Sequence, residues 1–175
     1  MIPSRGRRLE LGAGPRIRVW RRPRWLCAVA FGLALTVVPA KRLPAESSVR
    51  LAVIVNPAVP ATTLSAAELA SIFTRATRTW SNGTTVRALN LPQNSPERVE
   101  FDRVVLDMSP DRSAQYWIDR QIRGEEGAPK AIAQADIVVR LVPTMSGAIA
   151  YVPEDKVDAK VRVVARIRGG KVVAP

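Results

Sequence analysis

The sequence contains no histidine and a single cysteine, Cys27, among its 175 residues. Histidine is the usual general base and the commonest metal ligand in proteins, so its absence removes the ordinary route to acid–base and metal chemistry. Cys27 lies in an apolar run near the N-terminus, where we interpret it as a leader residue that is lost on cleavage. The mature chain would then have no disulfide and no thiolate nucleophile.

Glycine motifs that mark many enzymes and nucleotide-binding proteins are also missing. The sequence has no Gly-x-Ser-x-Gly nucleophile elbow and no glycine-rich loop that would cradle a phosphate. Its adjacent acids, Glu125-Glu126 and Glu154-Asp155, fall in expected loops, where neighbouring carboxylates are usually just solvated. We therefore expect a protein that is not an enzyme and that needs no metal and no cofactor.

The N-terminal segment has almost no acidic residues. Residues 1–45 hold ten Lys and Arg and one acid, Glu10, whereas residues 46–175 hold 17 Lys and Arg and 14 acids. The formal charge of +12 therefore belongs mostly to the N-terminal segment. The remaining chain is only weakly basic, so no nucleic-acid partner is expected.

The N-terminal segment has the order of regions found in a secretory signal peptide. A basic region ends at Arg24, and an uncharged, mostly apolar run of 16 residues follows from Trp25 to Ala40. Small residues at 38–40 and 43–45 resemble cleavage sites. We predict a signal peptide over residues 1–45 and a periplasmic or otherwise exported domain over residues 46–175. The alternative is an uncleaved anchor, which would be the only membrane contact, although the run is shorter than the roughly 20 residues of a typical span.

Strands and helices alternate along residues 46–175, which favours an α/β fold with one lobe. We expect buried or short strands over 49–55, 86–91, 148–152, 161–167 and 171–174. Helices should begin at three serines that can act as N-caps, namely Ser65, Ser95 and Ser109. Residues 132–142 are ambiguous, because the run Ile137-Val138-Val139 favours a strand while its setting allows a helix.

Apolar residues at helical spacing define the faces that these helices should bury. After Ser65, the expected stripe contains Leu69, Ile72, Phe73 and Ala76. The helix from Ser95 should bury Phe101, Val104, Val105 and Met108. The helix from Ser109 should bury Ala114, Trp117, Ile118 and Ile122. Tyr116-Trp117 could stack on a ligand, but core packing of Trp117 is the favoured interpretation.

Three segments, residues 64–86, 95–124 and 146–152, resemble in order and spacing the substrate-binding proteins of phosphate-type ABC transporters. They are most similar to the short, single-domain relatives of that family. The resemblance implies an α/β fold of the type II periplasmic-binding-protein class, with one lobe whose mixed sheet is flanked by helices. It also implies that residues 132–142 are mostly helical and that the protein is exported.

The resemblance places a ligand at the loop before the second helix. The serine of the family's phosphate loop aligns with Ser95, while its arginine falls on Leu91, its glycines on Asn94 and Pro96, and its threonine on Glu97. Because most of these donors are absent, we expect weak or no affinity for phosphate. The candidate ligand residues are Asn94, Ser95, Arg98, Asn56 and Thr144. Ser95 is also sufficiently explained as a plain helix cap.

A basic and aromatic run, Arg75, Arg78 and Trp80, follows the first helix. We interpret it as a solvated helix end with Trp80 packed over the core, because cations are favourable near a helix C-terminus. The family often has a Gly-Lys pair at this turn, and this chain has Arg75-Ala76 instead.

Two functions follow from the resemblance. The first is an exported solute-binding-like protein, related to phosphate ABC-transporter substrate-binding proteins, that binds a small oxyanion such as phosphate without catalysis. Its partner would be an ABC permease or an envelope sensor protein. The alternative is an envelope protein-interaction or sensor module whose ligand site has decayed.

Overall fold

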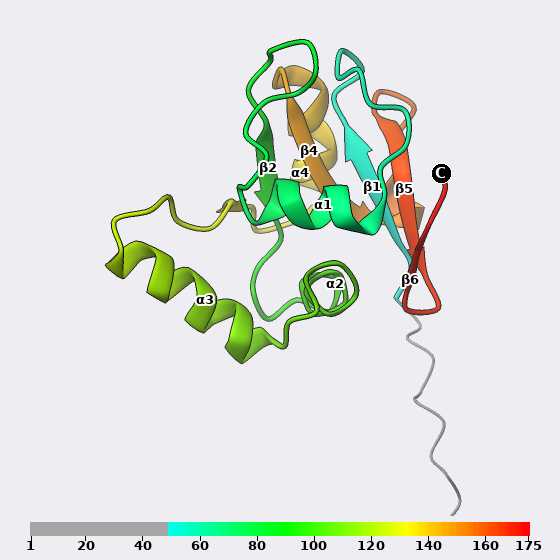
Figure 1. The fold of residues 1–175 in the computed structure, drawn as a ribbon. Helices are drawn as coiled ribbons and strands as arrows, with labels where there is room; N and C mark the ends of the chain where they lie inside the picture. The colour runs from blue at the N-terminus through cyan, green and yellow to red at the C-terminus, as the bar shows by residue number, and fades with distance from the viewer. Residues whose placement is uncertain (1–48) are drawn as a thin grey trace, which may run out of the picture. The chain divides into compact units, whose positions relative to one another are not determined.

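The computed structural model describes residues 49–175, and the expected leader over residues 1–45 lies outside them. The described chain forms one open, six-stranded mixed sheet in the order β3-β2-β4-β1-β5-β6 (Figure 1). Strand β1 pairs antiparallel with β4 and β5, whereas β2 runs parallel to β4 and β3. The strands are β1 (Leu51–Val55), β2 (Arg87–Asn90), β3 (Lys130–Ala131), β4 (Ala148–Pro153), β5 (Arg162–Arg168) and β6 (Lys171–Val173).

Helices cover both faces of this sheet. Figure 1 shows α1 and α2 in front of the sheet, α4 behind β4, and α3 set to one side. Helix α2 continues directly into a π-helix, η1, and two single 3-10 turns, η2 and η3, flank β4. The helical elements are α1 (Ala66–Phe73), α2 (Pro96–Phe101), η1 (Asp102–Leu106), α3 (Pro110–Ile122), α4 (Ala135–Leu141), η2 (Val142–Thr144) and η3 (Glu154–Lys156).

The core is centred on β1 and on a cluster of aromatic rings beneath α1. Every residue of β1 is fully buried, because the strand has a neighbour on each edge and helices on both faces. The ring of Phe101 stacks on Tyr151 with centroids 3.9 Å apart and contacts Phe73 at 4.5 Å. Burial of each such side chain contributes roughly 1.5–3 kcal/mol. The aromatic cluster thereby fastens α1 and α2 to β4.

A tight turn closes the upper end of the sheet. Gly147 has φ +73°, and a Cβ atom there would lie 2.1 Å from the carbonyl oxygen of Thr85. Its own carbonyl accepts a hydrogen bond of 3.0 Å from the indole Nε1 of Trp80, which is 7% exposed. Only glycine fits at position 147. Trp80 is packed over the core, as predicted.

Most of the expected elements are confirmed. Ser65, Ser95 and Ser109 each accept a hydrogen bond from a backbone N–H of the first helical turn. Residues 135–141 form α4, so the implied helix is confirmed in spite of the β-branched run. That run can be helical because Val138 and Val139 pack into the core on one face.

Burial on α3 differs from the sequence prediction. Trp117 is buried as expected, but Ile118 is 49% and Ile122 is 79% exposed. The prediction that these two isoleucines are buried is wrong, because α3 stands beside the sheet and contacts the rest of the lobe along a narrow face (Figure 1). Within residues 49–175, no helix has both the length and the apolar character needed to cross a bilayer.

Candidate functional site

The loop that precedes α2 leaves few hydrogen-bond donors for a ligand. Ser95 caps the helix, with its Oγ accepting from the N–H of Arg98 at 3.2 Å and its carbonyl accepting from Val99 at 3.0 Å. Pro96 has no N–H. The N–H of Glu97 is therefore the one first-turn donor for which the described residues supply no acceptor. This helix start alone cannot surround an anion.

The side chain of Arg98 turns into the molecule. It is 5% exposed, and its Nε donates to Oδ1 of Asp102 at 2.7 Å, while Nη2 donates to Oγ of Ser113 at 3.4 Å. Asp102 is itself 1% exposed. This buried pair balances the charge of Arg98, and the bond to Ser113 connects α2 to α3.

The phenol of Tyr151 lies next to this ion pair. Its hydroxyl accepts a hydrogen bond from the N–H of Leu91 at 3.4 Å and donates to Oδ1 of Asn90 at 3.5 Å. Burial raises the pKa of Tyr151 well above its ordinary range, and the nearby charge of Arg98 opposes that rise only in part. The phenol therefore stays neutral and acts as a fixed hydrogen-bonding group.

A cavity of about 280 Å³ opens between the loop, α3 and the segment before β3. The indole Nε1 of Trp117 is buried and has no hydrogen-bond partner among the described residues. A buried indole N–H normally has an acceptor. The polar or aromatic residues on its wall are Gln93, Arg98, Ser113, Trp117 and Gln121. The cavity thus combines a buried guanidinium with an unpaired donor.

Asn56 and Thr144 lie elsewhere. Asn56 follows β1 and is 7% exposed; its amide donates to the carbonyls of Val142 and Pro143 and accepts from Ala58. Thr144 is exposed, and its hydroxyl donates to the carbonyl of Leu141. These bonds fasten the end of β1 to the turn after α4.

The structure therefore divides the five candidate residues into two groups. Strand β1 is antiparallel to β4, and β4 is parallel to β2, so Asn56 lies at the end of the sheet where β2 begins. Asn94 and Ser95, in the loop before α2, and Arg98, in the first turns of α2, follow the opposite end of β2. Asn94 is exposed in that loop. One small ligand cannot touch both groups.

The sequence did not identify the α3 side of the cavity as part of a site. Ser113, Trp117 and Gln121 lie four residues apart, so they share one face of α3. The sequence does show a polar residue one turn on each side of Trp117. This pattern was outweighed by the apolar stripe of the same helix. Within residues 49–175, no group of His, Cys, Asp and Glu side chains could hold a metal ion.

Comparison with known proteins identifies the fold. No known family profile matches the sequence. No curated protein sequence matches it either. Solved structures do: an ABC-type phosphate transport receptor from Vibrio cholerae matches 66% of this chain and 46% of its own, with a TM-score of 0.53 and 17% identity. The chain folds as a single periplasmic-binding-protein-like lobe.

Two further structures resemble this lobe. A phosphate-bound structure from Clostridium perfringens, assigned to the phosphate ABC transporter substrate-binding proteins, has a TM-score of 0.54 at 17% identity and matches 66% of this chain and 45% of its own. PstS from Borrelia burgdorferi has a TM-score of 0.52 at 13% identity and matches 66% of this chain and 47% of its own. The resemblance is confirmed at the level of the fold. This chain spans less than half of the length of these structures.

Proposed function

We propose that this protein is an exported, non-catalytic solute-binding lobe that takes a small oxyanion into the cavity between the 91–98 loop and α3. The observation that carries the proposal is the unpartnered Nε1 of Trp117 in a cavity also lined by buried Arg98. An oxygen atom of a ligand would supply the missing acceptor. The structural neighbours, which include a phosphate-bound protein, support an oxyanion as the ligand class.

Charge limits which oxyanion fits. Asp102 lies 2.7 Å from Arg98, so the guanidinium carries no excess charge toward the cavity. A ligand would be held mainly by hydrogen bonds from Arg98, Ser113 and Trp117, and a dianion would remain partly uncompensated. The volume of about 280 Å³ lies just below the common range for small-molecule pockets, which favours a small ligand. We therefore expect weak affinity for phosphate and better affinity for a monoanion.

This proposal keeps part of the site expected from the sequence. Arg98 lines the cavity, whereas Asn94 and Ser95 do not line it and only belong to the same loop as Leu91 and Gln93, which do. Asn56 and Thr144 are left out, since they lie at the other end of β2. Export would depend on the leader over residues 1–45. An ABC permease or an envelope sensor would be the partner.

Calorimetry of the purified protein with phosphate, sulfate and acetate tests the ligand. The variant Trp117→Phe keeps the ring but removes the donor, and it should weaken binding by about tenfold, as expected for one hydrogen bond to a charged group. Gln115→Ala, an exposed residue of the same helix, is the matched control and should bind as the wild type does. No heat with any of the three anions, or equal affinity in Trp117→Phe, would refute the proposal.

Cell fractionation tests export separately. The protein should be recovered from the periplasm, with its N-terminus near residue 41 or 46. Recovery of the full-length chain in the membrane fraction would instead indicate an uncleaved anchor.

One observation favours the alternative, an envelope interaction or sensor module. Ile122 is largely exposed on α3, and its neighbour Ile118 is half exposed. Replacing Ile122 with serine should then reduce cross-linking to an envelope partner and leave anion binding unchanged. If the wild type binds no anion and Ile122→Ser loses the cross-link, this second function is favoured over the first.

A further inference from the structure

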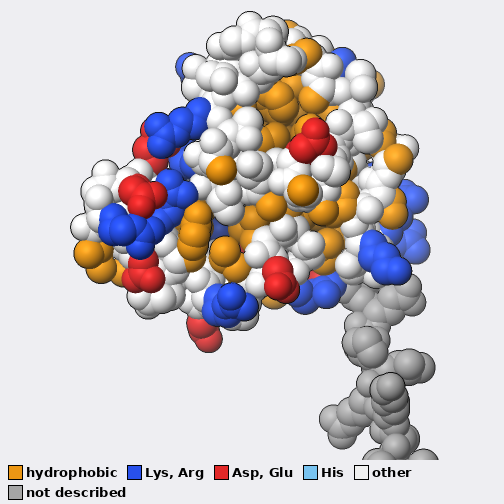
Figure 2. All heavy atoms as spheres, in the orientation of Figure 1, with side chains coloured by type: hydrophobic (Ala, Val, Ile, Leu, Met, Phe, Trp, Pro, Cys, Tyr) orange, Lys and Arg blue, Asp and Glu red, His pale blue; other side chains and the backbone are white. Residues whose placement is uncertain are grey.

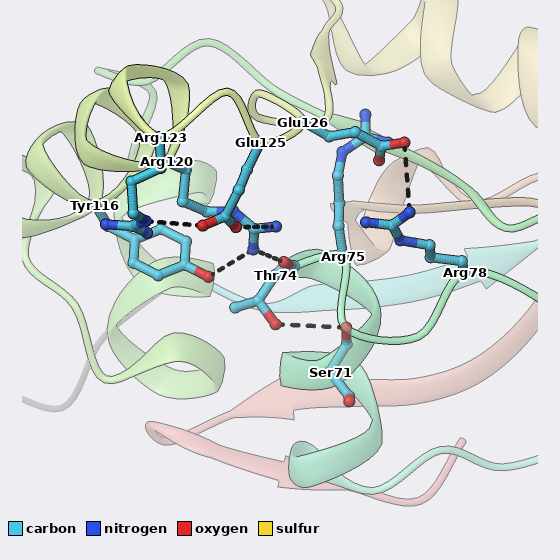
Figure 3. A network of polar contacts seen from close by, with 9 residues as sticks. All are labelled: Ser71, Thr74, Arg75, Arg78, Tyr116, Arg120, Arg123, Glu125 and Glu126. Carbon is cyan, nitrogen blue, oxygen red and sulfur yellow. Dashed lines mark hydrogen bonds and ion pairs between the residues drawn. The ribbon is translucent and has the colours of Figure 1, made fainter.

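A second polar cluster lies where the end of α1 meets the end of α3 (Figure 3). Arg75 and Arg78 share the carboxylate of Glu126, with their Nη1 atoms 3.1 Å and 4.0 Å from its two oxygens. Next to them, Arg120 and Arg123 bind Glu125 at 2.9 Å and 2.7 Å. Blue and red side chains accordingly lie close together above α3 on the left of Figure 2. Guanidinium groups outnumber carboxylates in this cluster.

The shared carboxylate borders a small cavity of about 120 Å³, which we call the Arg75–Arg78 cavity. Its size is well above the roughly 10–15 Å³ that one water molecule needs. Its wall combines the three charged residues with two threonines and three apolar residues. The residues that line it are Ile72, Arg75, Thr77, Arg78, Thr85 and Glu126, together with Val86 and Ala88.

Arg75 holds its place in the cavity against its own backbone preference. Its φ of +61° is the left-handed conformation, which costs a residue with a Cβ atom roughly 1–2 kcal/mol and costs glycine almost nothing. Its Nε is buried without a hydrogen-bond partner among the described residues. Backbone strain of this kind gathers at functional sites. An arginine at a glycine-type turn, with an unsatisfied donor, indicates that the side chain itself is needed.

Glu126 is held only by its side chain. It is half exposed, and it lies in a segment between Gly124 and Gly127. Within the described chain, the backbone of residues 126–128 makes no hydrogen bond, whereas Glu125 donates one to the carbonyl of Arg120. The carboxylate of Glu126 can therefore leave Arg75 and Arg78 without breaking an element of secondary structure.

We propose that the Arg75–Arg78 cavity is a second anion site, for a compact dianionic oxyanion such as phosphate or sulfate, and that Glu126 on its wall competes for the two arginines. When Glu126 swings out, two guanidinium groups face the cavity without a counter-charge. Two arginines that converge on one centre bind tetrahedral oxyanions through paired, charge-assisted hydrogen bonds. The site differs from the Arg98 cavity in charge, because Arg98 keeps its own buried partner.

Removal of the competing charge is the sharpest test. In calorimetry with sodium sulfate on the full purified chain, against sodium chloride of equal ionic strength, Glu126→Gln should bind sulfate about tenfold more tightly than the wild type, which corresponds to about 1.4 kcal/mol. Glu125→Gln is the matched control, since that carboxylate pairs with Arg120 and Arg123. It should change the affinity much less, although Arg78 also contributes to the lowered pKa of Glu125.

A second variant removes the site and relieves its backbone strain. Arg75→Gly suits the left-handed turn, so the protein should fold with an unchanged or higher melting temperature. Combined with Glu126→Gln, it should abolish the gain in sulfate affinity. Trp117→Phe should leave that gain intact, which separates this site from the Arg98 cavity. The proposal is overturned if Glu126→Gln binds sulfate no better than wild type, if Glu125→Gln gains equally, or if Arg75→Gly retains the gain.

Discussion

Two arginine sites of this lobe use similar chemistry in opposite surroundings. The pair between Arg98 and Asp102 is almost completely buried, and each charge has one fixed partner at 2.7 Å. Arg75 and Arg78 instead share the half-exposed carboxylate of Glu126. A buried pair cannot exchange its partner without leaving a charge in the interior, whereas a hydrated pair can. The first arrangement fixes Arg98 with its own counter-charge, so a ligand there would gain only hydrogen bonds, whereas the second can exchange its carboxylate for a ligand.

The largest difference between the two sites should appear when each loses its acid. Asp102→Ala leaves the guanidinium of Arg98 buried without a counter-charge, which should lower the free energy of unfolding by about 3–5 kcal/mol. Urea denaturation measures this value. Replacing both partners, as in Arg98→Met with Asp102→Leu, should cost much less than the single change. If the double variant is as unstable as Asp102→Ala, the loss of stability comes from altered packing and not from the unpaired charge of Arg98.

The helix cap that positions Arg98 should have a smaller effect. Ser95→Ala removes the oxygen that accepts from the N–H of Arg98, and it should destabilise the protein by about 1 kcal/mol. Thermal unfolding of Ser95→Ala beside Ser95→Asp, which keeps an acceptor, checks this expectation. Equal losses in both variants would mean that the cap bond contributes little.

Acid should weaken the partly buried carboxylate pairs before it affects the core. The hydrogen bond from Arg168, aided by Arg166, holds the pKa of Glu154 below its ordinary value. Because the folded-state pKa is the lower one, this pair stabilises the fold above the unfolded pKa of about 4.3, and its contribution is lost as the pH falls through the folded pKa. Glu154→Gln should therefore flatten the acid limb of a stability profile measured by urea denaturation. An unchanged acid limb would contradict the assignment.

The smallest effect on stability should come from removing the charge of Glu126, which pairs with Arg75 and Arg78 near the surface. Glu126→Gln breaks ion pairs in which both partners are hydrated, so it should change the free energy of unfolding by less than about 1 kcal/mol. The effect should shrink further in concentrated salt. A loss as large as that of Asp102→Ala would mean that Glu126 is structural, and the contrast between the two arginine sites would disappear.

The sequence predicted best the features that depend on neighbouring residues, and it predicted less well those that depend on tertiary contacts. The capped helix starts at Ser65, Ser95 and Ser109 were confirmed because a cap depends on residues within one turn. The strand propensity of Ile137-Val138-Val139 was overridden, since Val138 and Val139 face the core from α4. The resemblance to a known family settled that segment where local propensity could not.

The candidate site was less predictable than the fold. The sequence indicated the loop around Ser95, and a cavity does lie beside it. It could not show that Arg98 turns inward to Asp102, because rotamer choice depends on what α3 brings near. It also joined Asn56 and Thr144 to the site, although strand order places them at the opposite end of β2. Glu125 and Glu126 looked merely solvated until the fold placed four arginines around them.

The sequence alone determined where the chain changes direction and which faces are apolar, because turns and periodicity are read over a few residues. It also determined that histidine and thiolate chemistry are absent from residues 46–175. Tertiary structure decided which charges pair and which remain available. Arg75 and Glu126 lie 51 positions apart, and Arg98 and Ser113 lie on different helices. Such pairs form only when packing of the core brings the ends of α1, α2 and α3 together.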